Sequence, residues 1–192
     1  MRLYKYIIMF VFFVVVAVSQ VGCSFFKEPV GSIKEDVAET VATLKELPPL
    51  QEGENFIVVS IGGAFPGTRR VFIDFNKGRY IELFSQDSVG IREWKKAQEY
   101  EEYIANRVKN NIGIKYFKER KISAEEINYY RNVVEDAKLY NWKDEYKKEM
   151  TDGTQWSISI TLAGKYNRFI YGSNAFPNEW KNFIKYFSFL KS

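Results

Sequence analysis

Few residues of this chain could do chemistry near neutral pH. It has no histidine, which removes the usual general base and the commonest metal ligand. Cys23 is its only cysteine, so no disulfide can form within one chain. If the Cys23 thiol is blocked, Ser-His, Cys-His and zinc-type sites are excluded. We therefore expect no cofactor, and catalysis would need carboxylates, lysine, tyrosine or a hard cation held by oxygens.

Carboxylate pairs are the strongest catalytic alternative. Glycoside hydrolysis needs two carboxylates about 5 to 10 Å apart. Asp74 and Glu82 are candidates on adjacent predicted strands, and Asp152 precedes a hairpin. Asp74 and Glu82 both lie between apolar neighbours, which predicts that they project from a solvent-facing surface and pair with Arg70 and Arg79. An envelope enzyme acting on glycans thus stays open as an alternative to a binding protein.

The first 22 residues have the layout of a secretory signal. Arg2 and Lys5 give a basic start, residues 7–18 are all apolar, and small or polar residues lead to Gly22. Twelve helical residues span about 18 Å, well short of a roughly 30 Å hydrocarbon core. The apolar run therefore makes a poor permanent membrane span.

Gly22 followed by Cys23 resembles the end of a bacterial lipoprotein signal, although Gln20 stands where that family usually has leucine. The resemblance implies that signal peptidase II removes residues 1–22 and that acyl chains on Cys23 hold the protein in a membrane. Ser24 implies sorting to the periplasmic face of the outer membrane in a host with two membranes, or otherwise the outer face of the cell membrane. An ordinary signal peptide with an incidental cysteine, or a weak membrane helix, is the alternative.

The remaining chain divides by charge into a tether and one domain. Residues 27–54 contain three basic and seven acidic residues, whereas residues 55–192 contain 23 basic and 17 acidic residues. We expect residues 23–54 to form a polar tether with a short amphipathic helix at 33–47, which either docks on the domain or stays a free stalk. Residues 55–192 are long enough for a single domain with its own core. The modest charge of an exported domain argues against nucleic-acid binding, and the oligomeric state stays open.

Hydrophobic patterns predict an α+β fold. Strands are predicted at 56–61, 71–75, 79–84, 156–162 and 166–171, and helices at 88–110, 123–138 and 180–190. Residues 112–117 are ambiguous, and residues 140–150 carry apolar residues at the spacing of one helical turn. Residues 156–162 alternate apolar with Ser or Thr, which predicts one face in the core and one polar face. We expect an antiparallel or mixed sheet of about five strands in hairpins, with three to four helices packed mainly on one face.

One motif stands out in the second half of the chain. Trp142, Asp152-Gly153-x-x-Trp156 and Gly172-Ser173-Asn174-x-x-Pro177 are similar to a motif in uncharacterised exported bacterial proteins. The resemblance covers about 40 residues and implies no activity. Tryptophans in such a pattern favour core packing, and Asp152 and Asn174 favour turns. Residues 62–70 have glycines and arginines but lack the Gly-Lys-Ser/Thr of a phosphate loop.

These observations favour a lipid-anchored envelope protein whose domain binds an envelope protein or a glycan without catalysis. An inhibitor or immunity protein that blocks a toxic envelope enzyme is a special case. The candidate binding residues are Phe65, Arg69, Arg70, Trp142, Tyr146 and Asn174. No metal-ligating set is predicted.

Overall fold

The computed structural model describes residues 44–63, 67–86, 91–149 and 153–190. All of them belong to one compact unit, Leu44–Ser192. The predictions for Gly22, Cys23 and the secretory signal lie outside the described residues, as do Phe65, Asp152 and most of the predicted helix at 33–47.

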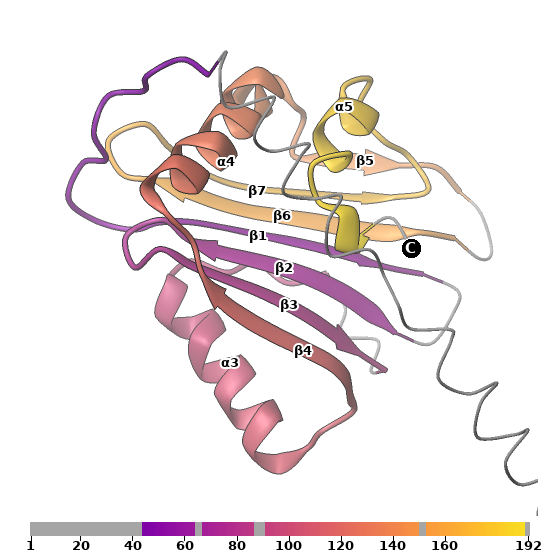
Figure 1. Cartoon of the computed structure of the whole chain (residues 1–192). Coiled ribbons are helices and arrows are strands. Elements are labelled where there is room, and N and C mark those ends of the chain that lie inside the picture. Colours follow the sequence, from indigo (N-terminus) through magenta and orange to yellow (C-terminus); the bar gives the residue numbers. More distant parts are fainter. Residues whose placement is uncertain (1–43, 64–66, 87–90, 150–152, 191–192) are drawn as a thin grey trace, which may run out of the picture. The chain divides into compact units, whose positions relative to one another are not determined.

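A seven-stranded mixed sheet forms the centre of the unit, in the order β4-β3-β2-β1-β6-β7-β5 (Figure 1). The strands are β1 (Asn55–Gly62), β2 (Thr68–Asp74), β3 (Arg79–Ser85), β4 (Ile114–Lys121), β5 (Glu145–Lys147), β6 (Gln155–Leu162) and β7 (Tyr166–Ser173). The helical elements are α3 (Ala97–Asn110), α4 (Ala124–Asp136), η1 (Leu139–Asn141), α5 (Trp180–Ile184) and η2 (Ser188–Leu190). All neighbouring strands run antiparallel except β5 and β7, which are parallel. The α+β prediction is confirmed, but the sheet has seven strands rather than about five.

The two additional strands are the edges of the sheet. β4 carries Lys115, Lys118 and Lys121, all exposed, so it lacks the apolar pattern that marks a buried strand. β5 is only three residues long and pairs with β7 through residues 145–147. Edge strands can be polar because one side of each has no neighbouring strand to pack beside it.

Helices cover both faces of the sheet, so the prediction that they pack mainly on one face holds only in part: α4 and α5 share one face, and α3 covers the other. On one face, residues such as Ile57 and Ile73 pack with α4 and α5. On the other face, Phe56 and Phe72 pack with α3. Figure 1 shows α3 on the side of the sheet opposite α4 and α5. β1 is largely apolar on both faces and β2 is buried on both, which is the physical reason for the two layers.

The predicted polar face of β6 is therefore buried as well. Ser157, Ser159 and Thr161 are at most 9% exposed, because they lie on the face that α3 covers. The Ser159 hydroxyl accepts a hydrogen bond from the backbone N–H of Trp94 at 3.0 Å. Hydrogen bonding of this kind lets small hydroxyl side chains line a core.

The helices differ from their predictions at their ends. α4 begins with the predicted capping box, in which Ser123 and Glu126 each accept the other's backbone N–H. α3 begins at Ala97 rather than near Ser88, and its first N–H donates to the Glu54 carboxylate at 3.1 Å. This cap comes from a residue distant in the sequence, so no local pattern could predict it.

Two further segments are less helical than predicted. Residues 140–150 contain the end of η1 and then β5, because Arg168 on β7 donates to the carbonyls of Tyr140 and Trp142 at 2.7 and 2.8 Å. Those carbonyls bond to β7 instead of continuing a helix. At the C-terminal end, α5 and η2 replace one long helix, but Phe187 and Leu190 are buried as their helical spacing predicts.

Residues 44–50 have no helix and pack against α4. Leu44 and Leu50 contact the core on that face. The carbonyl of Lys45 accepts from the Asn128 and Asn132 amides at 3.2 and 3.1 Å. Of the described helices, none is long and apolar enough to cross a bilayer.

Candidate ligand-binding site

Six aromatic rings meet where β5, β6 and β7 approach α5, and we call this group the aromatic corner. Its members are Trp142, Tyr146, Trp156, Phe176, Trp180 and Phe183. The Trp156 and Trp180 ring centroids are 4.4 Å apart, and Phe176 stacks on Trp156 at 6.1 Å with an interplanar angle of 15°. Offset and edge contacts of this kind stabilise ring clusters beyond simple burial.

The close pairing of β6 and β7 fixes the Trp156 ring. Trp156 lies directly opposite Gly172, and a β carbon on Gly172 would be 2.4 Å from the ring. Glycine at 172 therefore leaves the space that the indole fills. The indole N–H donates to the carbonyl of Ala175 at 2.9 Å, which also holds the loop after β7 in place.

Asn174 has a structural role beside this ring. Its φ is 57°, a left-handed conformation that asparagine tolerates better than most residues. Its backbone N–H donates to the carbonyl of Thr154 at 2.9 Å. A β carbon on Gly153 would overlap the Asn174 side chain. The motif residues thus lie together and shape the corner.

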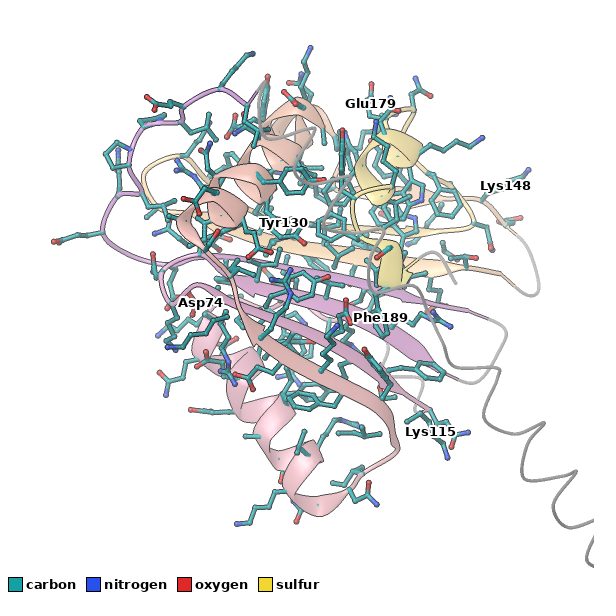
Figure 2. The ribbon with its side chains drawn as sticks, in the orientation of Figure 1. Asp74, Lys115, Tyr130, Lys148, Glu179 and Phe189 are labelled. Carbon is teal, nitrogen blue, oxygen red and sulfur yellow. The ribbon has the colours of Figure 1, made fainter. Side chains whose placement is uncertain are left out.

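A cavity of about 310 Å³ opens beside the aromatic corner. It is lined by Lys138, Asn141, Trp142, Lys143, Tyr146, Phe176, Pro177, Asn178 and Glu179. Glu179 is labelled in Figure 2 beside α5. This volume is at the lower end of the range for small-ligand sites, and the lining combines three aromatic rings and Pro177 with five polar or charged side chains.

The rings of the cavity are held rigidly. Trp142 is 4% exposed, and its indole N–H donates to the carbonyl of Ala137 at 3.0 Å. The Tyr146 hydroxyl accepts from the backbone N–H of Lys143 at 3.0 Å. Phe176 is 41% exposed although it stacks on Trp156, so it presents an open ring face on a fixed base.

The polar groups of the cavity come from a strained turn and from the start of α5. Lys138 has φ 52° and ψ 45°, a left-handed backbone that costs a non-glycine residue about 1 to 2 kcal/mol. Strained residues of this kind concentrate at binding and catalytic sites. Lys138 and Lys143 supply cations, Glu179 supplies a carboxylate, and Asn178 supplies an amide.

The structure brings some of the candidate residues together and separates others. Trp142 and Tyr146 line the cavity, and Asn174 lies beside it as a turn residue. Arg69 lies on the other half of the sheet, where its guanidinium donates to the carbonyl of Phe189 at 3.1 Å. Arg70 is only 2% exposed and faces α3. Phe176 and Lys138 were not among the predicted site residues, although Phe176 lies within the Gly172–Pro177 stretch of the motif.

Asp74 and Glu82 do not form a catalytic pair. Asp74 is 2% exposed, so the expectation of a solvent-facing side chain is wrong, and it accepts the backbone N–H of Lys77 at 2.9 Å. Glu82 is paired with Val71, whose side chain points to the α4 face, whereas Asp74 shares the opposite face with Phe72. Two carboxylates on opposite faces cannot act on one glycosidic bond. Within the described segments, no group of three or more acidic, histidine or cysteine residues is placed to hold a metal ion.

The fold is an α+β domain, and a cavity lined in part by aromatic rings opens beside α5. No protein-family model matches the chain, and neither the curated proteins nor the solved structures contain a match.

Proposed function

We propose that this chain is a lipid-anchored bacterial envelope protein and that its domain is a non-catalytic binding module. The aromatic cavity is the ligand site, and the exposed, rigidly stacked ring of Phe176 is the observation that carries the proposal. The signal-like segment ending at Gly22 and Cys23 supports the anchor and a location on the periplasmic face of the outer membrane, or on the outer face of a single cell membrane.

The shape of the site favours a sugar unit of an envelope glycan over a protein surface. A cavity of about 310 Å³ holds one ring-sized group, whereas stable protein interfaces bury about 1,200 to 2,000 Å². The faces of Phe176 and Tyr146 suit the apolar face of a pyranose, and Asn178 and Lys143 suit its hydroxyl groups. Rings already fixed by packing lose little entropy when a ligand binds.

The lining of the cavity supports binding rather than hydrolysis. Among its described residues, Glu179 alone carries a carboxylate, whereas hydrolysis by the common mechanism uses two. The site therefore has groups that hold a sugar but lacks the second acid or base.

Binding is tested with the full-length protein, purified from membranes in neutral detergent. Tryptophan fluorescence is followed during titration with N-acetylglucosamine oligomers and with muropeptides. We expect saturable binding that weakens about tenfold or more in Phe176→Ala, because stacking area is lost. Val108→Ala is the matched control, since Val108 is similarly exposed (43%) but lies on α3.

Equal binding by Phe176→Ala and the wild type, or no binding of any glycan, would contradict the cavity assignment. Crosslinking in the native envelope that captures one protein at the cavity would favour a protein partner instead. The anchor is tested by intact mass beside Cys23→Ala. A mature chain that starts at Cys23 with added acyl mass, lost in the variant, supports the lipoprotein, and an uncleaved chain contradicts it.

A further inference from the structure

Positive charge exceeds negative charge on the wall of the cavity beside the aromatic corner. Lys138 and Lys143 line the cavity from the segment between α4 and β5, and Glu179 lines it from the position before α5. All three residues are exposed, and within the described part of the chain none of them forms an ion pair. Because the wall has two cations and one carboxylate, one positive charge has no counterpart in the lining.

Two carboxylates that lie near these lysines in the sequence bind other cations. Glu135 lies three residues before Lys138, but it accepts the ammonium of Lys165 instead. Asp144 directly follows the second lysine of the wall, but it accepts the guanidinium of Arg168 on β7. Both lysines of the cavity are therefore left for an anion from outside the chain.

The backbone holds both lysines at the wall of the cavity. The N–H of Lys138 donates to the carbonyl of Glu135 at 2.9 Å, and the carbonyl of Lys138 accepts the N–H of Asn141 at 2.8 Å. The N–H of Lys143 donates to the Tyr146 hydroxyl at 3.0 Å. A left-handed backbone such as that of Lys138 favours glycine or asparagine, so the turn alone does not explain a lysine there. Both side chains start from fixed positions, which lowers the entropy lost when they bind a ligand.

We propose that the ligand of the cavity is an acidic sugar, one that carries a carboxylate or a phosphate group, and that Lys138 and Lys143 bind this group. This proposal rests on the proposed function, because it names the class of sugar that the same cavity takes. An ammonium group is a compact charge with three donors, so it suits a carboxylate and a phosphate alike. Coulomb attraction then adds to the hydrogen bond, whereas a neutral hydroxyl offers the hydrogen bond alone.

The test compares three sugars that share one ring. They are N-acetylglucosamine, which is neutral, N-acetylmuramic acid, which adds a carboxylate, and N-acetylglucosamine phosphorylated on its primary hydroxyl. Each is titrated into the full-length protein in neutral detergent at low ionic strength, and tryptophan fluorescence follows binding, because Trp142 lies in the cavity wall. We expect at least one acidic sugar to bind about tenfold more tightly than the neutral one, as two partly screened ion pairs imply. Sodium chloride should reduce this preference.

Charge-matched variants locate the preference for acidic sugars. Lys143 is exposed, so Lys143→Gln should fold, and it should remove most of the preference. The double variant Lys138→Gln, Lys143→Gln should remove all of it. Lys181→Gln is the control, because Lys181 is an exposed lysine on α5 that does not line the cavity, and this variant should keep the preference. Thermal unfolding without sugar checks that each variant is folded.

The outcomes separate this proposal from the proposed function. Equal binding of neutral and acidic sugars by the wild type overturns the acidic ligand but leaves a glycan site standing. Failure of all three sugars to bind contradicts the glycan site itself, and the acidic ligand with it. Equal loss of the preference in Lys181→Gln and Lys143→Gln also overturns the proposal, because the attraction then comes from the overall charge of the domain. A preference for the carboxylate or for the phosphate that disappears in Lys143→Gln identifies the oxyanion, and either result supports the lysine site.

Discussion

Replacement of Gly172 by alanine should destabilise the domain through the Trp156 ring. The new methyl group would lie 2.4 Å from two indole atoms, closer than any tolerated contact. Trp156 cannot move away freely, because it is 1% exposed and packs against Trp180 at 4.4 Å. Relief of the clash therefore requires the indole to shift and its hydrogen bond to the carbonyl of Ala175 to break.

The cost follows from these two events. Forcing one extra methyl into a packed core costs about 1 to 3 kcal/mol. Loss of a buried hydrogen bond adds about 1 kcal/mol. We therefore expect Gly172→Ala to lower the free energy of unfolding by about 2 to 4 kcal/mol, which for a domain of this size corresponds to a fall in Tm of roughly 5 to 15 °C.

The assay is urea unfolding of the full-length protein in detergent, followed by circular dichroism. Gly62→Ala is the control, because its methyl group would come no closer than 3.0 Å to the Thr68 hydroxyl and 3.2 Å to the carbonyl of Gly67, and we expect a smaller loss, of about 1 kcal/mol. The double variant Gly172→Ala, Trp156→Phe should lose less than the sum of the single changes, because the smaller ring makes room for the methyl. Equal losses for Gly172→Ala and Gly62→Ala, or strict additivity in the double variant, would refute the reasoning.

Three further changes test other parts of the fold by the same unfolding assay. Ser123→Ala removes the capping box of α4 and should cost about 1 kcal/mol, and an unchanged free energy of unfolding would contradict that role. Asn132→Ala removes a hydrogen bond to the carbonyl of Lys45 and should lower the free energy of unfolding by about 1 to 2 kcal/mol. Proteolysis near residue 45 should become faster, and unaltered cleavage would count against docking of this segment. Arg79 holds the pKa of Glu119 below its ordinary value through a hydrogen bond, so stability from this pair is present above about pH 4.3 and is lost as the pH falls through the depressed pKa. At pH 7 the free energy of unfolding of the wild type should exceed that of Arg79→Gln by under about 1 kcal/mol, and this difference should shrink towards pH 3. A difference that stays constant with pH would exclude this linkage.

The sequence predicted those elements whose cause is local. The capping box at Ser123 lies within four residues, and the alternation along residues 156–162 marks a strand without any partner in view. The hairpin between β2 and β3 has Gly78 at φ 58°, as its turn requires. The charged edge strand β4 was ambiguous, because exposure to solvent on one side removes the apolar signal.

The face assignments failed because they depend on the rest of the chain. Ser157 and Ser159 have the pattern of a solvent-facing row, but α3 covers them. The same helix buries Arg70, which was predicted to be a binding residue. A pattern reports the polarity of a face but not whether another layer packs on it.

The candidate site was partly predictable for the same reason. Trp142 and Tyr146 were singled out by residue type, and the structure places both in the cavity wall. Lys138 carried no sequence signal, because its role depends on a left-handed turn after α4. Phe176 lies between β7 and α5, where it stacks on Trp156 with one side and is left 41% exposed, and this placement depends on elements distant in the sequence.

The two edges of the sheet have a consequence for the protein at high local concentration. An open sheet exposes two rows of unpaired backbone groups, and these rows can template the addition of a strand from a neighbouring molecule. Here one row is only three residues long, and the other carries Lys115, Lys118 and Lys121, so a second β4 would bring like charges together. Crowded copies of the domain should therefore resist joining sheet to sheet, and the protein can reach a high local concentration without forming fibres.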